Sequence, residues 1–213
     1  MLKPGFPSGL YAITPETADT ARLLVQVEAA LTGGAAAVQY RDKSGDVARR
    51  HEQASELLAL CQRFKAPLII NDDLRLADLC GAAGVHLGRD DGSVAKARVI
   101  LGPDKLIGAS CYQSVELARV AQAEGADYVA FGSFYPSATK PQADRAEQTL
   151  LHAARTVIHV PIVAIGGITL SYALALLDAG ADSLAVLSAV FDAADARAAA
   201  HAFNQLFAFE PED

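Results

Sequence analysis

The chain has 213 residues, of which 52% are hydrophobic and 20% charged, so it can bury a large core. This composition excludes intrinsic disorder for most of the chain, because disorder requires low hydrophobicity together with high net charge. The net charge is −7 and no run of Lys and Arg supplies a basic stripe, so nucleic acid is not expected as a partner. A small anionic substrate remains compatible with this charge if a few cations converge in one cleft.

Cysteine spacing and hydropathy bear on the compartment. Cys61, Cys80 and Cys111 have no Cys-x-x-Cys spacing and are odd in number, which favours free thiols in a reducing compartment. Residues 1–9 lack the apolar stretch of a signal peptide, and no run of about 18 apolar residues is free of charges and turn residues. We therefore expect a soluble, cytoplasmic protein with no membrane partner. The oligomeric state is left open.

Short apolar runs alternate with longer, alanine-rich stretches along the chain. The short runs are nearly continuous in apolar residues, which is typical of strands buried on both faces of a parallel sheet. The longer stretches place apolar residues three and four positions apart, as Leu23, Val27 and Leu31 are, which predicts helices. Eight strands are predicted, at residues 10–13, 36–40, 68–70, 84–87, 106–109, 128–131, 162–165 and 183–187.

Eight such units average about 27 residues each, which fits an α/β fold of the (β/α)8 TIM-barrel type with few insertions. The main alternative is a doubly wound open sheet, which binds a dinucleotide through a Gly-x-Gly-x-x-Gly turn after its first strand. Residues 14–17 read Thr-Pro-Glu-Thr instead. We predict a single domain over residues 1–213, with an N-terminal extension at 1–8 and an acidic C-terminal tail at 208–213.

Charged residues follow the second predicted strand, at the end of a barrel where the chemistry lies. The segment consists of Gln39, Tyr40, Arg41, Asp42 and Lys43. Alternation along the chain would direct Gln39, Arg41 and Lys43 to the barrel mouth. Two cations and an amide make an anion site, in which Arg41 suits bidentate contacts with phosphate. A solvated surface loop is the alternative.

Carboxylates follow the third and fourth predicted strands. Asn71, Asp72 and Asp73 end the third strand, and Asp90 and Asp91 follow the fourth. Carboxylates from neighbouring strand ends can share Mg²⁺, which takes one or two carboxylates together with water and substrate phosphates. The alternative is that Asp73 or Asp90 only caps the helix that follows, because Asp is a preferred N-cap residue.

Hydroxyl groups and a lysine follow the fifth and sixth strands. Ser110 offers a hydroxyl at the mouth, and the long loop 132–141 carries Ser137, Thr139 and Lys140. These loop residues could hold phosphate oxygens in a candidate lid. The alternative is a proline-containing surface loop whose polar residues are simply solvated.

Glycines follow the seventh strand and a serine follows the eighth. Gly166, Gly167, Leu187 and Ser188 stand where this fold recurrently binds phosphate through backbone N–H groups. A tight turn without a ligand is the alternative for the glycine pair. His86, inside the fourth strand, is expected to be a hydrogen-bonded histidine of the core or rim and not a base.

Two anion sites at one mouth predict two phosphorylated substrates. No residue stands out as a nucleophile or as a general base paired with an orienting group, so covalent catalysis is not supported. The remaining chemistry is departure of a diphosphate. Its developing charge could be neutralised by Mg²⁺, Arg41, Lys43 and Lys140.

Six strings occur in order between about residues 10 and 190: LYAIT (10–14), QYRDK (39–43), LIIND (68–72), GVHLG (84–88), GADYV (125–129) and VAIGGI (163–168). In sequence and spacing they resemble the thiamine phosphate synthase family. The resemblance implies that a hydroxymethylpyrimidine diphosphate is joined to a thiazole or carboxythiazole phosphate, giving thiamine phosphate and diphosphate. It also implies that Mg²⁺ helps the diphosphate to leave and that the thiazole nitrogen captures a pyrimidine-methylene cation.

The resemblance also implies a role for each matching residue. It assigns the pyrimidine diphosphate to Gln39, Arg41, Lys43, Asn71, Ser110 and Lys140, with Arg41, Lys43, Ser110 and Lys140 as the catalytic groups. It assigns Mg²⁺ to Asp72 and Asp91. It assigns the thiazole phosphate to Ser137, Thr139, Gly167, Leu187 and Ser188. Tyr40, Asp42 and Ala138 complete the expected substrate-binding segments.

One departure from the family and two alternative functions remain. Many relatives read Gly-Pro-Ile-Phe-Pro-Thr where residues 132–137 read Gly-Ser-Phe-Tyr-Pro-Ser, so a serine replaces the first hydroxyl contact. A thiazole tautomerase shares the barrel, but Cys111 and Tyr112 stand where its Val-His would be expected. A non-catalytic, ligand-sensing barrel predicts loss of Asp72, Asp91 or Lys140, and all three are present.

Overall fold

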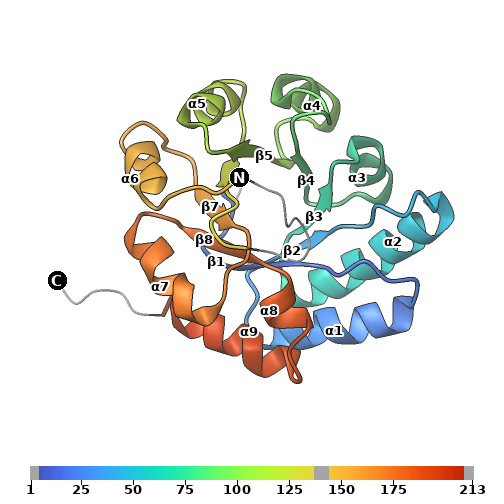
Figure 1. Ribbon diagram of the computed structural model, residues 1–213. Coiled ribbons are helices and arrows are strands. Elements are labelled where there is room, and N and C mark those ends of the chain that lie inside the picture. The colour runs from blue at the N-terminus through green and yellow to red at the C-terminus, as the bar shows by residue number, and fades with distance from the viewer. Residues whose placement is uncertain (1–4, 137–143, 209–213) are drawn as a thin grey trace.

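The computed structural model describes residues 5–136 and 144–208, which form a closed barrel of eight parallel strands in chain order. Figure 1 shows the strands at the centre with the helices in a ring around them. The strands are β1 (Gly9–Ile13), β2 (Ala37–Tyr40), β3 (Leu68–Asn71), β4 (Gly84–Leu87), β5 (Leu106–Tyr112), β6 (Tyr128–Phe131), β7 (Ile162–Ile165) and β8 (Ser183–Val186). The predicted TIM barrel is confirmed, and each predicted run forms a strand.

Helices separate the strands, and most begin at a side-chain cap. They are α1 (Thr20–Thr32), α2 (Val47–Phe64), α3 (Leu74–Cys80), α4 (Val94–Leu101), α5 (Val115–Ala123), α6 (Thr149–Arg155), α7 (Leu170–Asp178), α8 (Ser188–Phe191) and α9 (Ala196–Gln205). An Asp or Ser side chain accepts a backbone N–H at the start of α1, α2, α3, α4, α5 and α9. Neither α7 nor α8 has a side-chain cap bond. No helix among the described residues is long and apolar enough to cross a membrane.

Alternation along the strands divides the buried apolar residues into two clusters. The larger cluster lies between the strands and the helices and includes Val38, Ile70 and Val129. The smaller cluster fills the inside of the barrel with Phe6, Tyr11, Ile13, Ala37, Ile69, Leu106, Tyr128, Ala130, Val163 and Ala185. The inside therefore contains two tyrosines whose hydroxyl groups need partners. Gln39 and His86, which hydrogen-bond to these tyrosines, are also buried.

The barrel closes where the first and last strands meet. β1 pairs with β8 in parallel, from Gly9 opposite Ser183 to Ala12 opposite Val186. Outside this seam α9 packs against α1, with the Phe203 side chain fully buried. The two helices approach so closely that a Cβ at Gly33 would lie 2.4 Å from the Arg197 carbonyl oxygen. This closure brings all the carboxyl ends of the strands to one mouth.

Candidate active site

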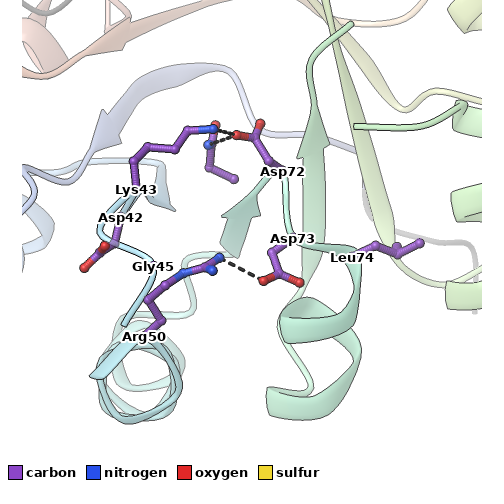
Figure 2. Close-up of a pocket in the computed structure, with 8 residues that line it drawn as sticks. Asp42, Lys43, Gly45, Arg50, Asp72, Asp73 and Leu74 are labelled. Carbon is purple, nitrogen blue, oxygen red and sulfur yellow. Dashed lines mark hydrogen bonds and ion pairs between the residues drawn. The ribbon is translucent and has the colours of Figure 1, made fainter. Parts of the chain in front are cut away.

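A pocket of about 360 Å³ opens at the carboxyl ends of β2 and β3. It is lined by Asp42, Lys43, Gly45, Arg50, Asn71, Asp72, Asp73 and Leu74. In Figure 2 the Lys43 and Asp72 side chains point toward each other across the pocket, and Arg50 points toward Asp73. The structure thus brings the predicted cation of the second strand end and the predicted carboxylates of the third to the same place.

Asp72 is the centre of this pocket. Its backbone is left-handed, with φ at 62°, and its N–H donates to the His86 carbonyl oxygen at 2.8 Å. Its Oδ2 accepts hydrogen bonds from Lys43 Nζ and, at 2.7 Å, from Asn71 Nδ2. The carboxylate is therefore held by a cation and an amide from two neighbouring strands.

Asp91 provides a second carboxylate next to Asp72. Its Oδ2 accepts the Gly88 N–H at 2.8 Å, and its side chain is hydrogen-bonded to that of Asp72. Burial works to raise the pKa of Asp72, but hydrogen bonds from Lys43 and Asp91 outweigh it and hold that pKa below 3.8. Burial and the neighbouring Asp72 raise the pKa of Asp91. The two carboxyl groups therefore tend to share one proton.

The carboxylate pair fits a hard divalent cation. A cation that displaces the shared proton would relieve the repulsion between Asp72 and Asp91. The carboxylate oxygens of the pair are ligands of the kind that Mg²⁺ prefers. The described residues contain no cluster of three or more His, Cys, Asp or Glu side chains that could enclose a metal. A metal here would take its other ligands from water and from a substrate phosphate, as Mg²⁺ usually does.

The helix-capping alternative holds for Asp73 but not for Asp90, and Asp91 is not a cap either. The Asp73 side chain caps α3 by accepting the Leu76 N–H at 2.8 Å, and it also pairs with Arg50 at 2.8 Å. α4 begins at Val94 and is capped by Ser93, so Asp90 and Asp91 precede the cap. Asp91 is therefore not needed to start a helix.

The segment from Gln39 to Lys43 divides between the barrel interior and the mouth. β2 ends at Tyr40, so only its first residues belong to the strand. The Gln39 amide lies inside the barrel and donates to Tyr11 Oη at 2.8 Å. Tyr40 points outward, and its hydroxyl donates to Gln53 Oε1 on α2 at 2.8 Å.

The remaining residues of this segment differ in their neighbours. Asp42 is buried and pairs with Arg49 of α2 at 3.3 Å. The Arg41 backbone is fixed by a hydrogen bond from its N–H to Thr14 Oγ1 at 3.0 Å. Among the described residues, no carboxylate forms an ion pair with the Arg41 guanidinium. Arg41 and Lys43 are thus the cations of this segment that can meet a ligand.

Ser110 and His86 meet inside the mouth. Ser110 Oγ lies 2.9 Å from His86 Nε2, and His86 Nδ1 lies 3.0 Å from Tyr128 Oη. His86 is thus a buried, hydrogen-bonded histidine, as predicted. Sequence reasoning missed the link to Tyr128, because that residue was assigned only as part of an apolar strand.

Arg89 and Tyr112 are a second feature that sequence reasoning missed. The Arg89 guanidinium lies 4.6 Å from the centre of the Tyr112 ring. The Tyr112 hydroxyl accepts the Arg89 N–H at 3.2 Å. This contact ties the end of β5 to the segment that carries Asp91, although no motif in the sequence pointed to it.

The glycines after β7 pack beneath the segment that follows β6. Gly166 and Gly167 both have positive φ, 104° and 61°. A Cβ at Gly167 would lie 2.2 Å from the Pro136 carbonyl oxygen, so no larger residue fits there without movement. Leu187 and Ser188 stand at the start of α8. The predicted residues Ser137, Ala138, Thr139 and Lys140 lie outside the described residues.

Comparisons with known proteins agree with one another. A family model described as thiamine monophosphate synthase matches residues 10–190. A relative from Thiobacillus denitrificans named thiamine-phosphate synthase is 70% identical over 208 residues, which are 98% of this chain and 99% of the relative. One of the same name from Methylobacillus flagellatus is 56% identical, over 93% of this chain and 95% of its own.

A solved structure extends this agreement to three dimensions. It is described as thiamine phosphate pyrophosphorylase from Pyrococcus furiosus and superposes with a TM-score of 0.84 at 34% identity. The superposition covers 94% of this chain and 95% of the other. The chain therefore belongs to the thiamine monophosphate synthase family.

Proposed function

We propose that this chain is the transferase that joins a hydroxymethylpyrimidine diphosphate to a thiazole or carboxythiazole phosphate, forming thiamine phosphate and releasing diphosphate. The observation that carries the proposal is the Asp72 and Asp91 pair beside Lys43 at the barrel mouth. Two carboxylates and a lysine match a metal-bound diphosphate, and the family of the chain gives the same reaction.

Asp72 and Asp91 would hold Mg²⁺ through their carboxylate oxygens. When bound, the ion would neutralise negative charge on the departing diphosphate. Lys43 would bind a diphosphate oxygen close to the ion, which its contact with Asp72 supports. The Asn71 amide, which also contacts Asp72, would bind the pyrimidine diphosphate next to that carboxylate.

The other residues would bind and orient the two substrates. Arg41 would add a bidentate contact to the diphosphate, and Gln39 and Ser110 would contact the pyrimidine ring from inside the mouth. The thiazole phosphate would meet backbone N–H groups at Gly167, Leu187 and Ser188, where the helices that follow carry no side-chain cap. We also retain Ser137, Ala138, Thr139 and Lys140 as substrate-binding residues, with Lys140 acting on the diphosphate.

Covalent catalysis by a cysteine is not supported by the described residues. Burial raises the pKa of Cys111, the thiol nearest to Ser110 in the sequence, to about 12, and burial has the same effect on Cys61. Thiolates are therefore scarce at neutral pH. A dissociative substitution, in which charge neutralisation drives the diphosphate out, needs no nucleophile from the protein. All three cysteines are free, which supports a cytoplasmic location for this reaction.

The test is diphosphate release by the purified chain. We expect release only when Mg²⁺, the pyrimidine diphosphate and the thiazole phosphate are all present, and we expect chelation of the metal to abolish it. Controls omit each substrate in turn. Conversion of one carboxythiazole tautomer into the other without diphosphate release would replace the proposal by the tautomerase. Tight binding of a phosphate ligand without turnover would replace it by a ligand-sensing barrel.

A further inference from the structure

A chain of hydrogen bonds crosses the inside of the barrel and joins two residues of the proposed pyrimidine site. Gln39 Nε2 donates to Tyr11 Oη at 2.8 Å, and Tyr11 Oη lies 2.9 Å from Tyr128 Oη. Tyr128 Oη lies 3.0 Å from His86 Nδ1, and His86 Nε2 lies 2.9 Å from Ser110 Oγ. Five strands, β1, β2, β4, β5 and β6, thus contribute one residue each to a single polar path.

The Gln39 amide determines the direction of the first bond of this path, because its N–H donates to Tyr11 Oη. Beyond that bond each hydroxyl can both donate and accept, so either tyrosine can be the donor of the hydrogen bond between them. The His86 tautomer decides the next two bonds. A neutral imidazole that accepts from Tyr128 at Nδ1 donates to Ser110 Oγ from Nε2, and one that donates at Nδ1 accepts the Ser110 proton at Nε2. In both arrangements the Ser110 hydroxyl is oriented by its hydrogen bond with His86 from inside the barrel.

Packing holds the two tyrosine rings in this arrangement. The Phe6 ring stacks on Tyr128 with centroids 3.9 Å apart and meets Tyr11 edge-on at 4.9 Å. Gly108 leaves the space for the Tyr128 ring, because a Cβ there would lie 2.0 Å from its Cζ. Burial raises the pKa of both hydroxyl groups well above 10, so both keep the proton that the path requires.

Filling the barrel with aliphatic residues would avoid the cost of burying two hydroxyls, an amide and an imidazole. The polar path instead ends at Gln39 and Ser110, the two residues that face the substrate under the proposed function. We propose that Tyr11, Tyr128 and His86 are positioning residues that fix the Gln39 amide and the Ser110 hydroxyl in the orientations in which they meet the pyrimidine ring. The inference rests on the proposed function.

Removing one hydroxyl from the path tests this role. We expect Tyr128→Phe and Tyr11→Phe each to raise KM for the pyrimidine diphosphate by about tenfold, the effect of one lost hydrogen bond in an ordered site, and to leave KM for the thiazole phosphate unchanged. Ser183→Ala is the matched control, because it removes a buried hydroxyl that donates to the Pro7 carbonyl oxygen at 2.8 Å at the amino end of β8. The control should keep both KM values.

A double-mutant cycle separates positioning from simple stability. If Tyr128 acts through Ser110, adding Tyr128→Phe to Ser110→Ala should raise KM no further than Ser110→Ala alone. If the KM increases of the two single variants multiply in the double variant, the two residues act independently, which would contradict the path. ¹⁵N NMR of labelled histidine provides a readout without turnover, with the His86 signals assigned by their loss in His86→Gln. We expect a single His86 tautomer in the wild type and a changed ¹⁵N pattern in Tyr128→Phe. An unchanged pattern in Tyr128→Phe would contradict the path.

The outcomes separate the inference from the proposed function. A wild-type chain that releases no diphosphate would remove the proposed function and this inference with it. An active wild type whose tyrosine variants lose stability but keep both KM values would remove the inference alone. Active variants with a raised KM for the pyrimidine diphosphate only would support both.

Discussion

Two carboxylates with opposite pKa shifts define the site at the scale of single residues. Asp72 is held ionised, whereas Asp91 has a raised pKa and retains its proton more readily, because it is partly buried and lies next to Asp72. Asp91→Asn keeps an oxygen for the Gly88 N–H but removes the charge. We expect the Mg²⁺ concentration for half-maximal rate to rise at least about tenfold.

The same substitution should not destabilise the metal-free protein. It removes a like charge beside Asp72 and leaves the cap of α4 at Ser93 intact, so the melting temperature should stay equal or rise. Asp104→Asn, an exposed charge removal in the turn before β5, is the control and should change neither quantity. A large fall in melting temperature for Asp91→Asn would show that Asp91 is structural.

The raised pKa of Asp91 also predicts how metal affinity depends on pH. As the pH falls through that pKa, which lies above the ordinary 3.8, a proton occupies the carboxyl group and Mg²⁺ must displace it. Asp72 stays ionised over this range because its pKa is lowered. Apparent Mg²⁺ affinity should therefore fall by about tenfold per pH unit below the pKa of Asp91, as for any one-proton competition.

Calorimetric titration with Mg²⁺ from neutral pH downward measures this dependence. Asp91→Asn should bind Mg²⁺ more weakly than the wild type and lose the steep dependence in the same range. A wild-type affinity that is flat with pH would mean that Asp91 is ionised before the metal binds.

The sequence identified residues by charge better than by buried contact. Lys43, Asp72 and Asp91 stood out because charged residues that follow the strands of a barrel lie at its mouth, and the structure brings these three together. Tyr11 and Tyr128 did not stand out, because an aromatic residue in an apolar run has the same pattern whether or not its hydroxyl is paired. Their partners come from strands distant in the chain, so only the closed barrel reveals them.

At the scale of elements, the turn after β7 depends on the segment after β6. Gly167 and Gly81 both have left-handed backbones, but a Cβ at Gly81 meets nothing within 4 Å, whereas one at Gly167 would strike Pro136. Gly81→Ala should cost about 1–2 kcal/mol of stability from backbone conformation alone and leave both KM values unchanged.

Gly167→Ala should lower stability further and raise KM for the thiazole phosphate, on the order of tenfold to a hundredfold, because the displaced turn moves its backbone N–H groups. Thermal melting and steady-state kinetics of the two variants measure the difference. Equal behaviour of the two alanine variants would mean that the contact with Pro136 does not position the thiazole site.

The sequence predicted where the strands lie more accurately than it predicted the residues at which they end. Each apolar run became a strand, because burial on both faces leaves little choice of residues. β5 continues to Tyr112, beyond the predicted end at residue 109, since polar residues at a barrel mouth remain within the strand. The cap of α4 is Ser93 and not one of the aspartates before it, a choice that depends on local backbone geometry.

At the scale of the whole molecule, we propose that residues 1–213 form a single domain whose stability depends on the seam between its two ends. β8 pairs with β1, and α9 covers the seam by packing on α1 with Phe203 fully buried. If the barrel is one cooperative unit, a substitution that loosens the packing of α9 should lower the free energy of unfolding of the whole barrel. Phe203→Ala should cost about 3–5 kcal/mol of unfolding free energy through loss of burial and the cavity left behind.

Urea unfolding followed by circular dichroism and by tyrosine fluorescence measures this cooperativity. We expect coincident single transitions in the wild type and in Phe203→Ala, with a lower midpoint and an unchanged slope in the variant, because the same surface is exposed on unfolding. Val25→Ala is the control, since Val25 lies on α1 with 68% of its surface exposed and should change stability by less than about 0.5 kcal/mol. Two separate transitions in Phe203→Ala would show that α9 detaches before the barrel opens, and the chain would then not unfold as one unit.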